Sequence, residues 1–266
     1  MNKVKVMVSG ACGRMGQEVM RAVLNDDALE LVGAVDVKNA GTDVGTVIGK
    51  AAVGIKIGTD LVEVIKASHA EVMVDFTSPS SVMKNIRLAL QQGVCPIVGT
   101  TGLSTQDVAE VKELCQKLQG RALIAPNFAI GAILLMQMSV QAAKYLPHVE
   151  IIELHHDQKL DAPSGTALRT AELIAEVRGT LRQGHPDEKE KLPGSRGGNF
   201  AGIPIHSVRL PGYVANQEVI FGGLGQTLTI RHDSISRESF MPGVTLACRK
   251  ASSIQGLMCG LENLLD

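Results

Sequence analysis

Residues 4–16 read Val-Lys-Val-Met-Val-Ser-Gly-Ala-Cys-Gly-Arg-Met-Gly, and this stretch decides the fold of the first part of the chain. The apolar run Val4–Val8 is typical of a buried strand. Met15, Val19 and Val23 then recur at the spacing of one face of a helix. The glycines between them, spaced G-x-x-G-x-x-G, predict a sharp turn that leads from the strand into the helix.

This glycine turn is also typical of a dinucleotide-binding site. One glycine permits the turn, another lets the backbone approach a pyrophosphate, and a third lets the helix pack closely on the sheet. The amino end of the helix offers N–H groups and a positive dipole end to the phosphates. Asp36 ends the second strand, 20 residues beyond Gly16, where a carboxylate can bind the ribose hydroxyls. The alternative is a turn needed only for packing. We expect NADH or NADPH to contact Gly10, Ala11, Cys12, Gly13, Arg14, Met15 and Asp36.

The preference between NADH and NADPH stays open at this stage. Asp36 favours the free 2′-hydroxyl of NADH because its carboxylate repels a 2′-phosphate. Lys38 and Arg14 could offset that repulsion, although Lys38 is equally well explained as a solvated loop charge. Cys12 is interpreted as a small filler in the loop rather than as a reactive thiol.

Strands and helices continue to alternate up to residue 128, which predicts a parallel sheet covered on both faces by helices. Further strands are predicted at 31–35, 72–76, 96–98 and 122–125, and helices at 82–92 and 105–119. We therefore expect a Rossmann-type dinucleotide-binding domain over residues 1–128. Two turns follow strands at the edge where such a sheet binds its cofactor. They add Gly99, Thr100, Thr101, Ala125, Pro126, Asn127 and Phe128 to the expected cofactor contacts, unless they are plain turns.

The pattern changes after Phe128. We predict a long apolar helix at 131–145, a strand at 149–155, a helix at 166–177, and strands at 205–210, 217–221 and 227–231. Residues 179–204 are rich in Gly, Pro and charge and predict a long loop. These elements indicate an α+β domain with an open mixed sheet over residues 129–236. A final helix at about 244–265 is expected to return, within the segment 237–266, to pack on the first domain.

The densest chemistry lies in residues 153–167, which read Glu-Leu-His-His-Asp-Gln-Lys-Leu-Asp-Ala-Pro-Ser-Gly-Thr-Ala. Two histidines close a strand, and imidazole is the usual group for proton transfer near neutral pH. Ser164 is a plausible N-cap, so the amides of Gly165 and Thr166 and the charge of Lys159 predict a receptor for a carboxylate. The alternative is ordinary helix capping beside a surface histidine. No metal-ligand spacing occurs, so we expect no metal.

The composition excludes several classes of function. The formal net charge is -1, and aromatic residues make up 3% with no Trp, which argues against a nucleic-acid or anionic membrane partner. The apolar stretches are too short to cross a bilayer, and the amino terminus lacks a signal-peptide pattern. Five cysteines without a C-x-x-C pair fit reduced thiols, so we expect a cytoplasmic protein.

Taken together, these motifs resemble the 4-hydroxy-tetrahydrodipicolinate reductase (dihydrodipicolinate reductase) family over nearly the whole chain. The resemblance rests on residues 10–16, 98–102 and 125–128, and above all on the run 153–167. Arg237, followed by Phe240 and Gly243, is similar to the family's C-terminal cofactor contact. One departure is Val37, because the family often has Arg after the acidic residue, and this leaves the NADPH preference in doubt.

The resemblance implies a reaction and a division of roles. The family reduces a cyclic imine with two carboxylates, which loses water, accepts hydride from NADH or NADPH and is protonated to tetrahydrodipicolinate, on the diaminopimelate route to lysine. His155 is implied as proton donor or acceptor and Lys159 as a second proton donor. The implied substrate contacts are His156, Lys159, Ser164, Gly165 and Thr166. Family members are generally homotetramers joined through the sheet of the second domain.

Two rival functions are weaker. A phosphorylating semialdehyde dehydrogenase would need a catalytic cysteine in the second domain, and Cys248 and Cys259 stand in the last predicted helix. A dinucleotide-sensing regulator would need a partner surface, commonly a basic DNA-binding module, and the sequence contains none. An assay of hydride transfer separates these three functions.

Overall fold

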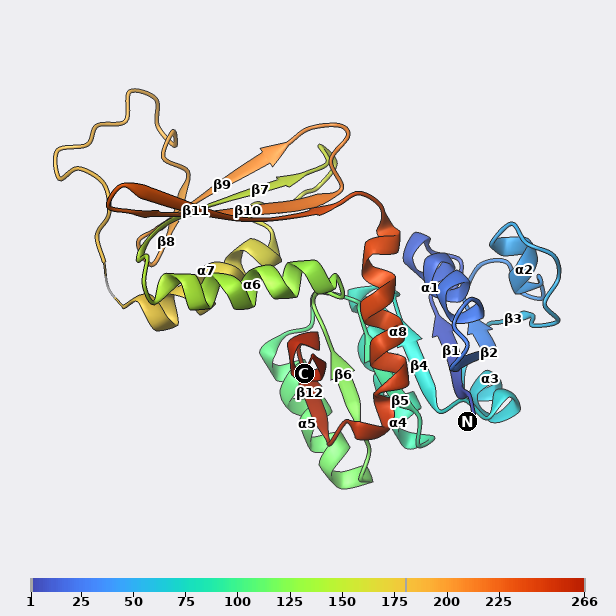
Figure 1. Ribbon diagram of the computed structural model, residues 1–266. Coiled ribbons are helices and arrows are strands. Elements are labelled where there is room, and N and C mark those ends of the chain that lie inside the picture. The colour runs from blue at the N-terminus through green and yellow to red at the C-terminus, as the bar shows by residue number, and fades with distance from the viewer. Residues whose placement is uncertain (1, 180, 266) are drawn as a thin grey trace. The chain divides into compact units, whose positions relative to one another are not determined.

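The computed structural model describes residues 2–179 and 181–265. Contacts divide the chain into two compact units (Figure 1). Unit 1 comprises Met1–Phe128 and Phe240–Asp266, and unit 2 comprises Ala129–Ser239. Among the described residues, no helix combines the length and the apolar character that a membrane span requires.

Unit 1 is built on a seven-stranded sheet in the order β12-β6-β5-β4-β1-β2-β3, and every pairing in it is parallel. Its strands are β1 (Val4–Ser9), β2 (Leu29–Val35), β3 (Ile57–Gly58), β4 (Val72–Asp75), β5 (Cys95–Val98), β6 (Ala122–Ile124) and β12 (Leu257–Cys259). Every residue of β4 and β5 is buried, as expected for central strands covered on both faces.

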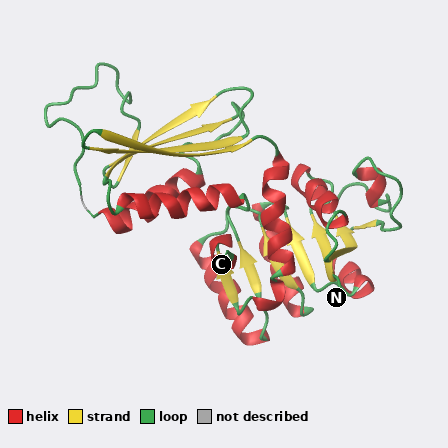
Figure 2. Cartoon of the chain, in the orientation of Figure 1, coloured by secondary structure: helices red, strands yellow, loops and turns green. Residues whose placement is uncertain are grey.

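Helices cover both faces of this sheet (Figures 1 and 2). The helix α1 (Arg14–Leu24) packs beside α8 (Met241–Arg249), and α4 (Pro79–Gln91) packs between α3 (Leu61–Ser68) and α5 (Thr105–Leu118). Local sequence signals mark where two of these helices begin. Ser104 and Asp107 form a capping box at the start of α5, and Pro79 is the first residue of α4. The predicted Rossmann-type architecture is confirmed. The short elements α2 (Val44–Val47), β3 and α3 were not predicted.

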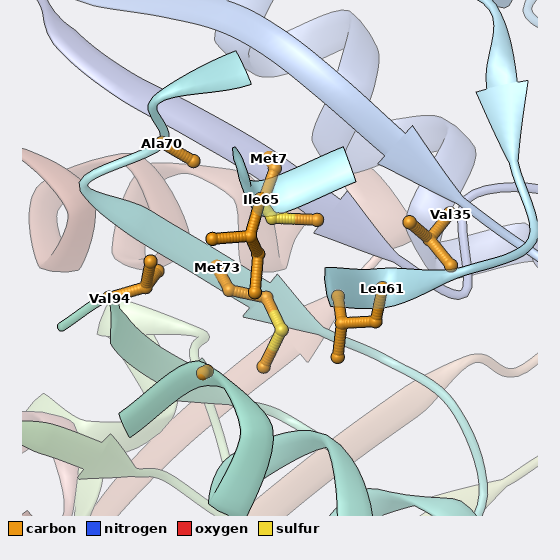
Figure 3. Packing of buried hydrophobic residues seen from close by; sticks show 8 residues of the cluster. Met7, Val35, Leu61, Ile65, Ala70, Met73 and Val94 are labelled. Atoms are coloured by element: carbon orange, nitrogen blue, oxygen red, sulfur yellow. The ribbon is translucent and has the colours of Figure 1, made fainter. Parts of the chain in front are cut away.

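A hydrophobic cluster holds the first strands together beneath their carboxyl ends. Met7 of β1 and Met73 of β4 are fully buried and pack with Leu61 and Ile65 of α3 (Figure 3). Burying a side chain of this size contributes about 1.5–3 kcal/mol. The direction of the strand order reverses between β1 and β4, and sheets of this kind bind their ligands in the crevice at such a reversal point. The cluster therefore holds together the strands on both sides of the expected crevice.

Unit 2 contains a five-stranded sheet in the order β11-β10-β7-β9-β8. The pairing of β7 with β9 is parallel and the other pairings are antiparallel, which confirms the predicted mixed sheet. Its elements are α6 (Ile130–Ala143), β7 (His148–His155), α7 (Gly165–Arg178), β8 (Gly198–Phe200), β9 (Ile203–Arg209), β10 (Ala215–Gly223), β11 (Gln226–Ser234) and η1 (Arg237–Phe240). Both helices lie on one face of this sheet (Figure 2), toward which β7 directs Val149, Ile151 and Glu153.

The prediction of a loop over 179–204 is wrong at its end. The strand β8 lies inside that range, and β9 begins at Ile203, two residues earlier than expected. The two strands form a hairpin whose turn contains Ala201 and Gly202, both with positive φ. Residues 181–197 do form the predicted loop, but Gly202 is a turn residue between two strands, and Ile203 and Ile205 are buried in β9.

The prediction of one helix over 244–265 is also wrong. The helix α8 ends at Arg249, and the chain continues through η2 (Ala251–Ser253), β12 and η3 (Leu261–Leu264). Gly256 and Gly260 both have positive φ, which interrupts a helix, and β12 pairs with β6 as the edge of the first sheet. Cys259 consequently lies in a strand rather than in a helix.

Candidate functional site

A cavity of about 830 Å³ lies in unit 1 where β1, β2 and β4 end. Its walls come from the loops that follow these strands and from the start of α3 and α4. Among the predicted cofactor contacts it is lined by Gly10, Cys12, Gly13 and Asp36. Its position at the carboxyl ends of parallel strands is the place where Rossmann sheets bind dinucleotides.

The glycine turn has no room for side chains. Gly10 adopts φ +81°, and a Cβ there would lie 2.3 Å from the carbonyl oxygen of Phe76. A Cβ on Gly16 would lie 2.1 Å from the carbonyl oxygen of Gly10. Gly13 lies between them, and its N–H donates to the Gly10 carbonyl at 3.1 Å. The backbone is therefore exposed at the amino end of α1, a cradle that fits a pyrophosphate.

Substituting Gly16 with alanine should weaken dinucleotide binding at least tenfold. The new methyl group would meet backbone atoms of Gly10 and Ala11, which cannot rotate away, so the turn must open. Titration calorimetry with NADH measures the loss. Gly198→Ala is the matched control, because its Cβ would meet nothing nearer than 3.8 Å. Equal affinity for NADH in Gly16→Ala and in the wild type would contradict the cradle.

Asp36 is held in place by the loops around it. Its Oδ2 accepts from the Cys12 N–H at 2.8 Å, and its Oδ1 accepts from the Lys38 N–H at 2.9 Å. The carboxylate therefore lies beside the glycine turn and faces the cavity. Burial raises the pKa of the Cys12 thiol, and the nearby Asp36 charge raises it further. A thiol so disfavoured from ionising fits the interpretation of Cys12 as a filler.

A buried carboxylate next to this cavity joins two loops. Asp75, at the end of β4, is fully buried and accepts from Thr100 Oγ1 at 2.7 Å and from Thr77 Oγ1 and Asn85 Nδ2 at 2.8 Å. Thr100 Oγ1 also accepts from the Thr77 N–H at 2.7 Å. The loops after β4 and β5 are thus fixed to each other, and the Thr100 hydroxyl makes two of the hydrogen bonds that join them.

Phe76 packs against two of the predicted segments. Its ring lies 5.9 Å from that of Phe128 between centroids, at 58°. A Cβ on Gly99 would fall 2.1 Å from the same ring. Ala125 is buried and donates its N–H to the Val98 carbonyl. These contacts give Gly99, Ala125 and Phe128 packing roles, whether or not they also touch a cofactor.

The remaining predicted cofactor contacts lie at the surface or inside the turn. Ala11 is fully buried, and its N–H donates to the Val35 carbonyl at 3.2 Å. Arg14, Thr101 and Pro126 are exposed, while Met15, Asn127 and Arg237 are half-buried. Arg237 opens η1 at the end of unit 2. Their contact with a cofactor stays a prediction.

Sequence reasoning missed one wall of the cavity. Phe76, Thr77, Ser78, Ser80, Ser81, Lys84 and Asn85 line it, from the end of β4 into α4. The available signal was the one used for residues 99–101, namely polar residues directly after a buried parallel strand. The cavity also includes Thr59 and Asp60, which follow the unpredicted strand β3.

The second candidate site is built around the end of β7 in unit 2. Glu153 is fully buried, and its Oε2 lies 2.5 Å from Nδ1 of His155. Arg209 of β9 donates to both carboxylate oxygens, at 2.7 and 2.8 Å. The N–H of Ser164 donates to Oε1 at 3.2 Å. The predicted histidine and the predicted helix start therefore meet at one carboxylate, which the sequence analysis did not single out.

The charge of Glu153 is strongly stabilised. Burial by itself raises the pKa of a carboxyl group, but hydrogen bonds from His155, Arg209 and Ser207 outweigh burial and lower the pKa of Glu153 to about 2. The interaction with Glu153 in turn raises the pKa of Arg209. This group is consequently a carboxylate throughout the neutral range.

The amino end of α7 is capped as predicted. Ser164 is buried, and its Oγ accepts from the Ala167 N–H at 3.2 Å. Gly165 is exposed, and a Cβ there would meet nothing within 4 Å. Further along the helix, Thr170 is bonded by Gln217 of β10 at 2.8 Å, which seats α7 on the sheet. The helix start therefore presents backbone N–H groups at an open position, as an anion receptor requires.

Lys159 and His156 lie in the loop between β7 and α7. Lys159 Nζ donates to Asp161 Oδ1 at 2.6 Å, and its side chain is only 21% exposed. The Asp161 carbonyl accepts from Arg209 at 2.8 Å, so this loop is tied to the Glu153 cluster. His156 is half-buried beside it. The described residues contain no group of three or more His, Cys, Asp or Glu side chains able to hold a metal.

The depressed pKa of Glu153 predicts acid sensitivity. A folded-state pKa of about 2, below the ordinary value of 4.5, means that this group stabilises the fold fully above about pH 5. That stability is lost as the pH falls toward 2, and it amounts to about 3 kcal/mol. Urea unfolding at fixed protein concentration from pH 7 to pH 2 measures it. Glu153→Gln should show a shallower pH dependence, and identical slopes would contradict the assignment.

Comparison with known protein families gives matches across both units. Residues 4–128 match the family model described as dihydrodipicolinate reductase, N-terminus, and residues 131–265 match dihydrodipicolinate reductase, C-terminus. The two matches together span almost the entire chain.

Individual proteins give the same result. The chain is 58% identical over 267 residues to the 4-hydroxy-tetrahydrodipicolinate reductase of Desulfitobacterium hafniense (strain DSM 10664 / DCB-2), with all of both chains covered. It is 51% identical over 263 residues to the enzyme of that name from Moorella thermoacetica, covering 99% of this chain and 98% of the relative. Among solved structures, it is similar to a dipicolinate-bound dihydrodipicolinate reductase from Paenisporosarcina sp. TG-14, with a TM-score of 0.88 and 45% identity, covering 99% of this chain and 100% of that one.

Proposed function

This chain belongs to the dihydrodipicolinate reductase family, and from that premise we propose how its residues carry out the reaction. It is an NAD(P)H-dependent oxidoreductase of the diaminopimelate route to lysine. It reduces 4-hydroxy-tetrahydrodipicolinate to tetrahydrodipicolinate with loss of water. The observation that carries this function is the full-length match to the family, together with the cavity at the glycine turn of unit 1.

The cofactor site is assigned to unit 1, with Arg237 of unit 2 as one additional contact. The glycine turn at residues 10–16 holds the pyrophosphate, and Asp36 binds the adenosine ribose. Gly99, Thr100, Thr101, Ala125, Pro126, Asn127, Phe128 and Arg237 are proposed to complete the site. The bound dihydronicotinamide supplies the hydride. Both NADH and NADPH are accepted, because Asp36 suits a free 2′-hydroxyl while Lys38 lines the same cavity and offers a cation to a 2′-phosphate.

The substrate site is assigned to unit 2. The solved relative holds dipicolinate, a flat ring with two carboxylates. We assign the carboxylates of the substrate to the amino end of α7, at Ser164, Gly165 and Thr166, and to Lys159 and His156. Two anionic groups need several donors and at least one cation, and this segment supplies both. His155 is the proton donor or acceptor, and Lys159 is a second proton donor.

Steady-state kinetics test the function directly. The purified chain is mixed with enzymatically generated 4-hydroxy-tetrahydrodipicolinate, and the oxidation of NADH and NADPH is followed in separate reactions. We expect turnover with both cofactors. Cofactor binding without substrate-dependent oxidation would overturn the proposal and favour a dinucleotide sensor. Turnover only with an unrelated semialdehyde would favour the rival dehydrogenase.

We further propose a homotetramer formed through the sheet of unit 2. The face of this sheet opposite α6 and α7 carries the half-buried apolar side chains of Ile152, Leu154, Val208 and Ile220. Apolar groups on an uncovered sheet face are typical of an interface between subunits.

Light scattering after size exclusion should give four times the chain mass of 28.2 kDa. Ile152→Asp should lower the mass, because it places a charge in the proposed interface. Val177→Asp on the outer surface of α7 is the control and should keep the tetramer. A wild-type monomer would contradict this assembly.

The setting follows from the reaction. We place the enzyme in the cytoplasm, where amino-acid biosynthesis runs and where its five cysteines, none of them bridged, stay reduced. The dicarboxylate substrate and the cofactor are its small-molecule partners, and we propose neither a nucleic-acid nor a membrane partner.

A further inference from the structure

The proposed roles of the second site leave two of its most constrained residues unused. Glu153 is completely shielded from solvent, and two nitrogens of Arg209 donate hydrogen bonds to its carboxylate. A buried ion pair of this kind seldom adds stability beyond what apolar residues of the same size would give. Its contact with the ring of His155 suggests that it serves the imidazole.

We propose that Glu153, clamped by Arg209, is the positioning residue that fixes the His155 ring with Nδ1 as hydrogen donor and Nε2 as the proton-exchanging atom. This inference rests on the proposed function, because it assigns a partner to the imidazole that exchanges the proton. It adds a specific atom and a specific orientation.

The tautomer follows from the inventory of donors and acceptors. An ionised carboxylate only accepts hydrogen bonds, so the contact between Oε2 and Nδ1 requires the hydrogen to sit on Nδ1. In the neutral ring, Nε2 then carries the lone pair and accepts a proton, and in the imidazolium ring Nε2 donates one.

Arg209 makes this arrangement rigid. It stands opposite His155 in the parallel register of β7 with β9, and Ser207 stands opposite Glu153. Its Nη1 and Nη2 atoms donate to the two carboxylate oxygens of Glu153, so the carboxylate plane cannot rotate while the salt bridge holds. The same guanidinium donates to the carbonyl of Asp161, whose side chain holds Lys159. One cluster therefore holds the His155 ring, the loop that carries Lys159 and, through the Ser164 N–H, the start of α7 in fixed positions.

The charged groups around His155 come from several elements. Its own strand provides Glu153, the neighbouring strand β9 provides Arg209, and the loop provides Lys159 paired with Asp161. Strand β10 places the uncharged Ala215 opposite His155. The first charged residue on α7, Arg169, is exposed and paired with Glu172. Glu153 is therefore the anion in direct contact with the ring, and Arg209 balances its charge.

Glutamine at position 153 should reverse the tautomer. Its amide keeps one acceptor oxygen, and this oxygen best takes the place of Oε1, where Arg209 and the Ser164 N–H both donate. The amide NH₂ then faces Nδ1 of His155 and donates to it, which leaves the ring hydrogen on Nε2. The ring then loses the acceptor that orients it.

The same strand offers a matched control. Glu150, three residues earlier, also binds one arginine and one histidine, Arg196 at 2.6 Å and His206 at 2.8 Å. It lies on the opposite side of β7 from Glu153, away from the proposed site but on the sheet face that carries Ile152 and Leu154, so light scattering must show that Glu150→Gln keeps the wild-type mass. Glu150→Gln therefore breaks a cluster of the same composition without touching the imidazole that matters here.

The experiment compares the wild type, Glu153→Gln, Arg209→Met and Glu150→Gln by kcat, by KM for the dicarboxylate and by the affinity for NADH. Glu153→Gln should lower kcat at least tenfold, with the affinity for NADH unchanged. Arg209→Met frees the carboxylate to rotate and should also lower kcat. Glu150→Gln should match the wild type in kcat and KM. A folded Glu153→Gln with wild-type kcat would overturn the proposal.

The tautomer provides a readout that does not depend on turnover. Nitrogen-15 NMR of histidine-labelled protein should place the hydrogen of His155 on Nδ1 in the wild type and on Nε2 in Glu153→Gln, with His155→Gln used to assign the signal. If the wild type fails to reduce the substrate, the function fails while this measurement still decides the positioning. If Glu153→Gln does not fold, the wild-type spectrum and Arg209→Met decide it, and a hydrogen on Nε2 in the wild type would overturn it.

Discussion

Replacing His155 with glutamine is expected to lower kcat by about 10²- to 10⁴-fold, the usual contribution of a general acid or base. Glutamine cannot exchange a proton near neutral pH, so the proposed protonation step loses its donor. The affinity for NADH should stay within about twofold of the wild type, since His155 belongs to unit 2 and the glycine turn belongs to unit 1. Steady-state kinetics give kcat, and calorimetry with NADH gives the dissociation constant.

His148→Gln is the matched control for this variant. His148 begins the same strand that His155 ends, it is exposed, and the proposed mechanism does not use it. It should retain wild-type kcat and KM. A His155→Gln enzyme with unchanged turnover would remove this residue from proton transfer, and an equal loss in His148→Gln would point to damage of the strand instead.

Replacing Lys159 with alanine is expected to impair binding and turnover together. The variant removes a cation beside a substrate with two negative charges, and a charge-assisted hydrogen bond is worth about 1.5–3 kcal/mol. KM should therefore rise about tenfold or more, and kcat should fall as well because Lys159 is the proposed second proton donor. Initial rates over a range of substrate concentrations separate the two effects.

Two further variants locate the cause of the Lys159 effect. Lys159→Arg keeps the charge and should restore KM more than kcat, since guanidinium does not give up a proton. Lys144→Ala removes an equally positive side chain at the end of α6, outside the proposed site, and should behave as the wild type. Unchanged KM and kcat in Lys159→Ala would contradict the carboxylate receptor.

Much of unit 1 could be predicted because its signals are local. The apolar runs that became β1, β2, β4, β5 and β6 are short and bounded by turn residues, and the helical spacing of apolar residues identifies α1, α4 and α5. The elements that were missed carry weak local signals. The strand β3 has two residues and depends on pairing with β2, and the helix α2 has only four residues.

The two wrong predictions share a physical cause. Residues 198–200 and 257–259 became strands because an existing strand offered unpaired backbone groups at its edge. Neither segment has the alternating apolar pattern that would announce a strand. Near residues 198–200 the glycines were interpreted as signs of a loop, and around residues 257–259 they were not used in the prediction. In both segments glycines form turns at the ends of strands.

The sequence by itself determined the family, the glycine turn at residues 10–16 and the candidate segment 153–167, because each is a contiguous run whose chemistry can be interpreted locally. Tertiary structure alone decided which groups touch. Glu153 and Arg209 are 56 residues apart and meet because β7 and β9 pair in parallel, and the cavity gained Phe76 and Asn85 because β4 lies beside β1. Strand pairing is set by burial and backbone hydrogen bonds summed over a whole sheet, so no local pattern encodes which side chains it brings together.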